Sequence, residues 1–359
     1  MAEMIELNNV SFQYETDSGD QALKHITLGI KKGECVVLTG ESGCGKTTLT
    51  RCVNGLVPDF YEGSLSGELF LEGQSLLALP QYQKSSRIGT VFQDPRSQFF
   101  TVNSTDEAAF GCENLAMSTE EINRRVNQSF RSLQMENLRD RSLFELSSGE
   151  RQKLAIASVY AMDTAVLVLD EPSANLDQRT IGILRDILLK LKQEGKTLLI
   201  SEHRLSYLMG VADRYLYIRE GEIAESWTPE EAARLTDEER SRFGLRSFRQ
   251  IRLEDITREV QTGPEERVIE GQGLAVKLGG TEIFRSLDFS FRWGKKGKVV
   301  GILGDNGSGK TTFARVLCGL LKPSEGKIRI DGRVTTPKQR IRLTYFVMQD
   351  TDYQLFTES

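Results

Sequence analysis

The chain has 359 residues and a formal net charge of −5, with 39% hydrophobic and 27% charged residues. This balance is typical of a globular protein long enough for two domains, and it gives no general basic field that would attract nucleic acid. No apolar run approaches the ~18 residues of a membrane-spanning helix, and the five cysteines contain no C-x-x-C pair that would indicate a zinc site.

Two alternating segments come first and predict antiparallel strands with one face exposed. Apolar and polar residues alternate from Ile5 to Tyr14 and again from Leu23 to Ile30. Tyr14 ends the first segment, where its ring either packs at the strand edge or stacks on a nucleotide base. The residues alone leave these two alternatives open.

A glycine-rich segment from Gly40 to Thr47 fits the phosphate-loop pattern G-x-x-x-x-G-K-[ST]. The apolar run Cys35–Leu38 before it predicts a buried strand, and the residues from Thr48 to Val53 predict the start of a helix. Glycines allow successive backbone N–H groups to turn toward phosphate oxygens, and the helix N-terminus adds its positive end. The Lys46 ammonium would then reach the β- and γ-phosphates and the Thr47 hydroxyl would bind Mg²⁺; the alternative is a plain glycine-rich turn. The expected nucleotide-binding residues are Gly40, Ser42, Gly43, Gly45, Lys46, Thr47 and Thr48.

The next candidate positions lie at a strand end and at a helix start. The strand that begins near Arg87 stops at Gln93, whose amide either caps the strand or contacts Mg²⁺ and the attacking water. After a polar, helical stretch from about Ser104 to Leu143, the segment Ser147-Ser148-Gly149-Glu150 opens another helix. Its N–H groups and hydroxyls would bind an anion, although such a segment by itself is also an ordinary helix N-cap.

Two further strand ends carry acidic and imidazole side chains. The unbroken apolar run Ala165–Leu169 predicts a strand buried on both faces, and it ends in Asp170-Glu171. Asp170 would hold Mg²⁺ through its water shell and Glu171 would polarise the water that attacks the γ-phosphate; the alternative is a charged strand end that faces solvent. The next buried strand delivers His203, whose imidazole would bond the γ-phosphate and position the water.

The phosphate loop occurs a second time, from Gly304 to Thr311, after the apolar run Val299–Leu303. Residues 268–291 repeat the early alternating strands, and Leu278 falls about where Tyr14 would recur. A charged stretch from 236 to 267 separates the two copies and predicts a solvated, partly helical connector. In the second copy, the expected nucleotide-binding residues are Gly304, Gly307, Gly309, Lys310, Thr311, Thr312 and Gln349, of which Thr311 and Gln349 would also bind Mg²⁺.

The order of these motifs resembles the ATPase domain of the ATP-binding-cassette (ABC) family. The first phosphate loop is followed by Gln93, Leu146–Glu150, Asp170-Glu171, Asn175–Asp177 and His203. The family signature L-S-G-G-Q appears with Ser148 and Glu150 at its third and fifth places. This resemblance covers residues 1 to about 235 and implies that Tyr14 stacks on the nucleotide base. It also implies that Ser147, Ser148 and Gly149 contact ATP held by another cassette.

The implied fold is an α/β P-loop NTPase of the ABC ATPase type, with a parallel-sheet core, an antiparallel β subdomain and a helical subdomain. The expected domains are a first ABC ATPase domain at 1–235, the connector at 236–267 and a partial second ABC ATPase domain at 268–359. The second copy reaches Ser359 without a signature, an Asp-Glu strand end or a switch histidine. We therefore expect that Ser359 is not the natural end of the chain.

The segment from Gln93 to Pro95, together with Gln98-Phe99-Phe100, further resembles the energy-coupling-factor (ECF) importers, which take up vitamins and metal ions. This resemblance implies an ATPase with ATP and Mg²⁺ as cofactors, placed at the cytoplasmic face of the membrane. Its expected partners are a transmembrane transporter subunit, a substrate-binding membrane protein and a second ABC cassette in cis or in trans, with no nucleic acid. Two alternatives remain open: a soluble ABC ATPase that acts on ribosomes or DNA, and a nucleotide-gated scaffold.

Overall fold

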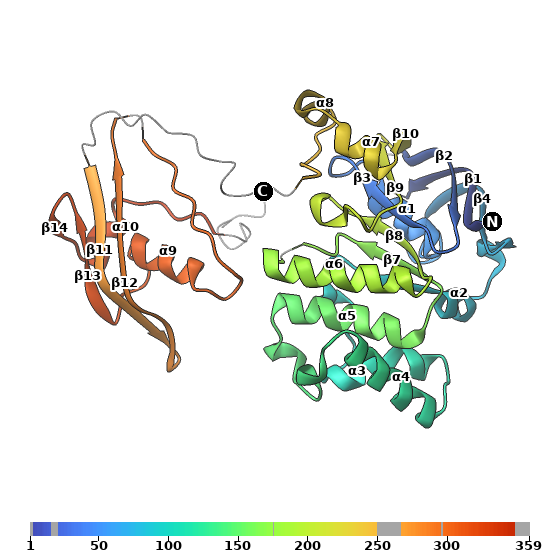
Figure 1. Ribbon diagram of the computed structural model, residues 1–359, viewed down its shortest axis with the longest axis horizontal. Helices are drawn as coiled ribbons and strands as arrows, with labels where there is room; N and C mark the ends of the chain where they lie inside the picture. Colours follow the sequence, from blue (N-terminus) through green and yellow to red (C-terminus); the bar gives the residue numbers. More distant parts are fainter. Residues whose placement is uncertain (1–2, 16–20, 175, 250–266, 296, 349–359) are drawn as a thin grey trace. The chain divides into compact units, whose positions relative to one another are not determined.

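The computed structural model describes residues 3–15, 21–174, 176–249, 267–295 and 297–348 (Figure 1). The chain divides into two compact units, Met1–Arg252 and Leu253–Ser359. Among the described helices, none combines the length and the apolar character that crossing a membrane requires. The fold is of the α/β class, as the alternation of buried strands and amphipathic helices predicts.

The first unit begins with a small antiparallel sheet. Its strand order is β2-β1-β4-β5, and the pairs β1–β2, β1–β4 and β4–β5 are all antiparallel. The strands are β1 (Glu3–Tyr14), β2 (Gln21–Lys31), β4 (Gly63–Leu71) and β5 (Gln74–Ser75). The alternation in β1 and β2 buries one face, for example at Leu7 and Leu23, so the prediction of two antiparallel strands is confirmed.

A six-stranded sheet of order β10-β9-β3-β8-β7-β6 forms the centre of the first unit. Its strands are β3 (Cys35–Thr39), β6 (Ile88–Val91), β7 (Val166–Asp170), β8 (Thr197–Ser201), β9 (Arg214–Arg219) and β10 (Glu222–Trp227). All neighbours pair in parallel except β10, which is antiparallel to β9. Strands β3, β7 and β8 are buried at every residue, as their unbroken apolar runs predict for parallel strands covered on both faces.

The central sheet separates two hydrophobic cores, because successive side chains of a strand point to opposite faces. In β3, Cys35 and Val37 belong to the core shared with the long helices, whereas Val36 and Leu38 belong to the core shared with the antiparallel sheet. The carboxyl ends of β3, β6, β7 and β8 therefore meet along one edge between the two layers. Candidate side chains that follow these strands are brought together at that edge.

Helices cover the central sheet and extend into a separate helical layer (Figure 1). They are α1 (Lys46–Val53), α2 (Gln81–Arg87), α3 (Ser104–Asn114), α4 (Thr119–Ser132), α5 (Ser148–Met162), α6 (Gln178–Gln193), α7 (Pro229–Arg234) and α8 (Asp237–Arg242). The expected helical stretch from 104 to 143 is interrupted after α3, and Ser118 caps a new helix through its side chain. Helix α5 runs from the signature segment through the middle of this layer, with Leu154 and Ile156 fully buried.

Residues 236–249 pack on the first unit. The Phe248 ring is 3% exposed and meets the Tyr215 ring of β9 edge to face at 5.2 Å. The Phe243 ring contacts Tyr217 at 5.0 Å and Trp227 at 5.3 Å between centroids. The first compact unit thus continues past the boundary at 235 that the sequence analysis expected, because these aromatic side chains bury themselves against β9 and β10 despite the charged residues around them.

The second unit repeats the antiparallel sheet, with strand order β12-β11-β13-β14. Its elements are β11 (Arg267–Leu278), β12 (Thr281–Trp293), β13 (Glu325–Ile330), β14 (Arg333–Val334), α9 (Lys310–Cys318) and α10 (Pro337–Ile341). The core is small and is built from Ile269, Leu274, Val276, Val316 and Ile328. The run Val299–Leu303, whose counterpart in the first unit is β3, forms no strand here, and Val299 is 98% exposed. In the described part of this unit no parallel strand flanks the run, so its backbone groups lack a ladder to join.

Candidate phosphate site

The turn between β3 and α1 has the backbone that a phosphate loop needs. Gly40 has φ 146° and Gly45 has φ 111°, which is the region that favours glycine. A Cβ atom would lie 2.2 Å from the Ile218 carbonyl at Gly40 and 2.7 Å from the Ala22 carbonyl at Gly45. Both approaches are to backbone, so neither position tolerates a side chain.

Lys46 is held beneath this loop without a negatively charged partner. Its side chain is 4% exposed, and its Nζ atom donates to the carbonyls of Gly40 at 3.0 Å and Glu41 at 2.7 Å. Among the described carboxylates none pairs with it. A buried ammonium that contacts only backbone carbonyls, at the N-terminus of α1, is suited to an anion in the adjacent pocket. That pocket is lined by Ser42, Gly43, Gly45, Lys46, Thr47, Thr48, Gln93 and Glu171.

Thr47 and Asp170 supply oxygen atoms on the floor of the site. The Thr47 hydroxyl donates to Asp170 Oδ1 at 3.4 Å, and Asp170 is 7% exposed at the end of β7. The described residues include no group of three or more His, Cys, Asp or Glu side chains that would enclose a metal ion. A hydroxyl and a carboxylate fit Mg²⁺, because this ion takes few protein oxygens and keeps several of its waters.

Gln93, Glu171 and His203 meet at the ends of the neighbouring strands β6, β7 and β8. The Gln93 amide donates to Glu171 Oε2 at 2.8 Å, and His203 Nε2 lies 3.2 Å from Glu171 Oε1. Glu171 has φ 44°, and its N–H donates to the Ser201 carbonyl at 2.9 Å, so the carboxylate is turned out of the strand direction. Both carboxylate oxygens are therefore engaged at the rim of the phosphate pocket.

Tyr14 is anchored to the helix that follows the phosphate loop. Its hydroxyl lies 3.1 Å from Thr48 Oγ1 and accepts a hydrogen bond from Arg51 Nη1 at 2.9 Å. The Arg51 guanidinium also lies over the Tyr61 ring, 3.8 Å from its centroid. Arg51 was not among the site residues expected from the sequence; a signal for it is its spacing of four residues from Thr47, which places both on one face of α1.

The signature-like segment starts α5 and lies outside the lining of the phosphate pocket. The Ser147 hydroxyl accepts from the Glu150 N–H at 3.3 Å, and Glu150 Oε2 accepts from the Ser147 N–H at 2.8 Å, which is a reciprocal capping box. Partial burial opposes ionisation of Glu150, but the hydrogen bonds from Ser147 outweigh it and lower the pKa of this carboxyl. Glu150 thus fixes the orientation of the segment that contains Ser148 and Gly149.

Gly149 is tightly packed, and this gives a testable prediction. A Cβ atom on Gly149 would lie 2.7 Å from Thr180 Cγ2, at the start of α6. We expect Gly149→Ala to lower the free energy of unfolding by about 1–3 kcal/mol, because the two helix starts must move apart. Thermal unfolding of the single variant and of Gly149→Ala/Thr180→Ala checks this. The double variant should recover most of the loss, and equal melting of wild type and Gly149→Ala would contradict the packing argument.

The second phosphate loop keeps the backbone of the first. Gly304, Gly307 and Gly309 have φ 154°, 79° and 91°, close to the 146°, 79° and 111° of their counterparts. Lys310 Nζ donates to the carbonyls of Gly304 and Asp305, both at 2.7 Å. Thr311 and Thr312 follow in the first turn of α9. Gln349 lies outside the described residues.

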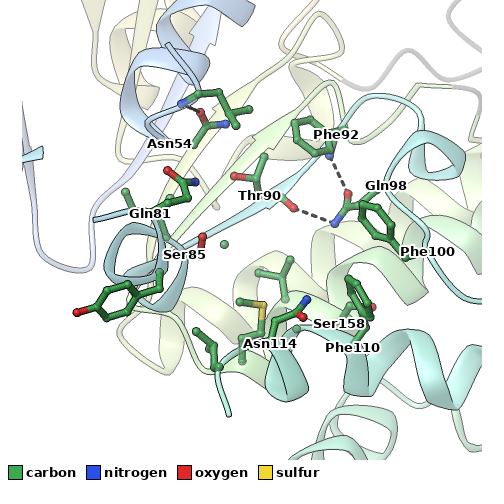
Figure 2. Close-up of a pocket in the computed structure, with 18 of the residues that line it drawn as sticks. Asn54, Gln81, Ser85, Thr90, Phe92, Gln98, Phe100, Phe110, Asn114 and Ser158 are labelled. Atoms are coloured by element: carbon green, nitrogen blue, oxygen red, sulfur yellow. Dashed lines mark hydrogen bonds between the residues drawn. The ribbon is translucent and has the colours of Figure 1, made fainter. Parts of the chain in front are cut away.

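A second hollow of the first unit lies between β6 and the helical layer (Figure 2). The Gln98 side chain accepts from the Phe92 N–H at 3.1 Å and donates to the Thr90 carbonyl at 3.0 Å, so it fixes the segment around Gln93. Phe100 is 74% exposed and stacks on Phe110 with 5.0 Å between centroids. This hollow is therefore partly aromatic. Phe92, which lines it, directly precedes Gln93, the residue that bonds Glu171.

Comparison with known proteins identifies relatives over nearly the whole chain. The profile of the ABC transporter family matches residues 23–174 and 286–358. A Treponema denticola protein described as an ABC transporter ATP-binding protein is 42% identical over 363 residues, which cover 99% of this chain and 73% of that protein. A Methanosarcina acetivorans protein of the same description is 32% identical over 99% of this chain and 65% of its own length.

Solved structures are similar to a part of the chain about the size of one cassette. The cbiO1 protein from Clostridium perfringens, described as part of the ABC transporter complex cbiONQ, has a TM-score of 0.59 and 28% identity, covering 67% of this chain and 94% of its own. A dimeric post-hydrolysis structure of the ATP-binding cassette MJ0796 with ADP and phosphate has a TM-score of 0.56 and 25% identity. The match covers 63% of this chain and 99% of the MJ0796 chain.

Proposed function

The chain belongs to the ABC transporter family and is an ATPase of the cassette type, and from this premise we propose that it energises an ECF-type importer of a vitamin or a metal ion. The observation that carries the ATPase part of the proposal is the contact of Glu171 with Gln93 and His203 beside the Lys46 pocket. The importer part is supported by the similarity to cbiO1, which is described as part of the ABC transporter complex cbiONQ. A carboxylate held beside the phosphate pocket is needed by an enzyme that activates water there. A scaffold that only binds nucleotide does not require it.

Each residue of the site has a proposed part in ATP hydrolysis. Lys46 and the N–H groups of the loop bind the phosphates, and Thr47 and Asp170 provide the oxygen atoms suited to Mg²⁺, which neutralises phosphate charge when bound. Glu171 accepts a proton from the attacking water while the water oxygen bonds to the γ-phosphorus and ADP leaves. His203 lies 3.2 Å from Glu171 and is placed to bond the γ-phosphate oxygens.

Two further proposed roles concern residues at the edge of this site. Tyr14 is proposed to stack on the nucleotide base, a role supported by the anchoring of its hydroxyl at Thr48 beside the phosphate pocket. Gln93 is proposed to contact Mg²⁺ or the attacking water once ATP is bound. Its present hydrogen bond to Glu171 keeps the amide within reach of both.

ATP in this pocket is proposed to meet the signature of a second cassette, in cis or in trans. The signature-like segment of the first unit is absent from the lining of its own phosphate pocket. The dimeric form of the MJ0796 cassette supports pairing of this kind. In the second unit, Gly304, Lys310 and Thr311 are proposed to bind nucleotide through the same loop geometry.

The membrane partners are proposed to dock at the hollow of Figure 2. Its exposed aromatic side chains, Phe100 and Tyr82, are 74% and 65% exposed, which suits contact with an apolar helix from another protein. Gln98 links the same hollow to the Gln93 segment, so a partner bound there would sense the state of the site. We propose a transmembrane subunit as the partner, at the cytoplasmic face of the membrane. Membership of cbiO1 in a larger transporter complex supports this.

Transport by the intact complex tests the proposed function. The full chain is purified from detergent-solubilised membranes with its membrane partners and reconstituted into lipid vesicles. We expect labelled vitamins or divalent metal ions to accumulate with ATP and not with ADP, and Phe100→Ser to reduce recovery of the partners without lowering ATP turnover by the isolated chain. Turnover that is stimulated by ribosomes or DNA and indifferent to membranes would instead favour the soluble alternative.

A further inference from the structure

Glu202 is a buried carboxylate that directly precedes His203, and its side chain bonds backbone groups of two loops beside the site. It is 2% exposed, and no described Lys, Arg or His pairs with it. Its Oε1 atom accepts from the N–H groups of His203 at 2.7 Å and Arg204 at 2.9 Å. Its Oε2 atom accepts from the Ser173 N–H at 3.2 Å and the Tyr207 hydroxyl at 2.8 Å. Four donors on one buried carboxylate form a fully satisfied network, which rigidifies what it joins.

The network joins two loops of the site. Ser173 lies two residues after Glu171, in the loop that follows β7, while Glu202 and His203 lie in the loop that follows β8. A second bond runs between the same loops, from Arg204 Nη1 to the Leu176 carbonyl at 3.0 Å. The loop that carries the Glu171 base and the loop that carries the His203 imidazole are thus connected by the side chains of Glu202 and Arg204. Neither of these side chains contacts the Glu171 carboxylate or the His203 ring.

Tyr207 supplies the fourth donor of the network, to the Oε2 atom of Glu202. Burial, and then the charge of Glu202, raise the pKa of the Tyr207 hydroxyl well above its usual value. The hydroxyl is therefore protonated at neutral pH and donates to Oε2 at 2.8 Å. The second oxygen of Glu202 has a permanent donor beside the one from Ser173.

We propose that Glu202 is a positioning residue for ATP hydrolysis. It ties the loop after Glu171 to the His203 loop, and so it maintains the 3.2 Å distance between Glu171 Oε1 and His203 Nε2. The proposal rests on the function proposed for Glu171 and His203. Without the tie, the two loops are held together less rigidly, by the Arg204 bond to the Leu176 carbonyl. The base then loses its alignment with the water more readily than the phosphate loop loses ATP.

Substitution of Glu202 by glutamine breaks the tie at one point. The amide oxygen keeps the two N–H donors of His203 and Arg204, since the opposite orientation would place the amide NH₂ against both. The NH₂ group then faces the Ser173 N–H, and two donors cannot form a hydrogen bond with each other. The Tyr207 hydroxyl can rotate and accept a hydrogen bond from the NH₂ group. The bond to Ser173 is lost and the turn that carries His203 is kept.

The test is steady-state hydrolysis and ATP binding by the full chain. We expect Glu202→Gln to lower kcat by about 10- to 100-fold and to leave ATP affinity within about threefold, since the phosphate loop is untouched. In a Glu171→Gln background, the same change should lower the residual turnover no further, because the base that it positions is already absent. Glu107→Gln is the matched control: Glu107 is a 3% exposed carboxylate that accepts from the N–H groups of Phe100 and Thr101 in another loop.

The control should lose a similar amount of thermal stability but keep its kcat. If Glu202→Gln fails to fold, Arg204→Met removes only the second tie and should give the same loss of kcat at constant ATP affinity. Normal kcat in folded Glu202→Gln, or an equal further loss in the Glu171→Gln background, would overturn the positioning role. Normal turnover in Glu171→Gln itself would instead remove the proposed function on which it rests.

Discussion

Replacement of Glu171 by glutamine is expected to lower ATP turnover by about 10²–10⁴-fold while ATP still binds. Glutamine has the same shape, and its amide oxygen still accepts the Gln93 hydrogen bond of 2.8 Å. The amide cannot take a proton from water, so the step in which the water oxygen attacks phosphorus loses its base. Lys46 and the loop N–H groups are unchanged, which is why binding should persist.

Phosphate release and equilibrium binding of a fluorescent ATP analogue separate the two effects. Glu222→Gln makes the same chemical change at an exposed position of β10 and should behave as wild type. Wild-type turnover in Glu171→Gln would show that another group activates the water. Loss of binding together with turnover would mean that Glu171 supports the pocket itself.

The sequence predicted those features of the site that depend on short segments of chain. The glycine spacing of the phosphate loop, the buried run before Asp170 and the strand before His203 are local patterns, and the corresponding strands and loop are present. Glu171 and His203 were each expected at the end of a buried strand, and the structure shows that these strands, β7 and β8, pair with each other. The place of β3 between β8 and β9 was not predictable, because strand order depends on pairings between residues more than a hundred positions apart.

Contacts made by ordinary-looking polar residues were missed for the same reason. Glu202 directly precedes the candidate His203, but its role depends on Ser173, which is 29 residues away and on another loop. Gln98 likewise acts through hydrogen bonds to backbone groups of Phe92 and Thr90. No pattern of residue types marks a carboxylate or an amide whose partners are backbone N–H groups and carbonyls.

Composition alone does not decide the structure at two places. Residues 236–267 were expected to be a solvated, partly helical connector. Within the described part, 236–249, Phe243 and Phe248 pack on Tyr217 and Tyr215, while residues 250–266 lie outside the described residues. The apolar run Val299–Leu303 has the composition of a buried strand, yet it forms none in the described part of the second unit. In the first unit an equivalent run becomes β3 because β8 and β9 pair with it on both sides. An apolar pattern thus predicts a strand only where neighbours exist to receive its hydrogen bonds.

Replacement of Lys46 by alanine is expected to weaken ATP binding by about 10- to 100-fold, as the loss of a charge-assisted contact to phosphate predicts. At an ATP concentration that saturates the wild type, the turnover of Lys46→Ala should fall together with its affinity. The ammonium is 4% exposed and bonds the Gly40 and Glu41 carbonyls, so its removal leaves these two acceptors unpaired beneath the loop and the phosphates without their cation. Lys32→Ala removes an exposed ammonium from the turn after β2 and is the matched control.

Comparison of the Lys46→Ala and Glu171→Gln variants separates binding from chemistry at one site. Lys46→Ala should lose affinity and turnover together, whereas Glu171→Gln should lose turnover alone. Binding stoichiometry adds a further distinction, since nucleotide that still binds to Lys46→Ala should report the second loop and disappear in Lys46→Ala/Lys310→Ala. Full affinity in Lys46→Ala, with a stoichiometry equal to that of wild type, would contradict the assignment of the first loop as a phosphate site.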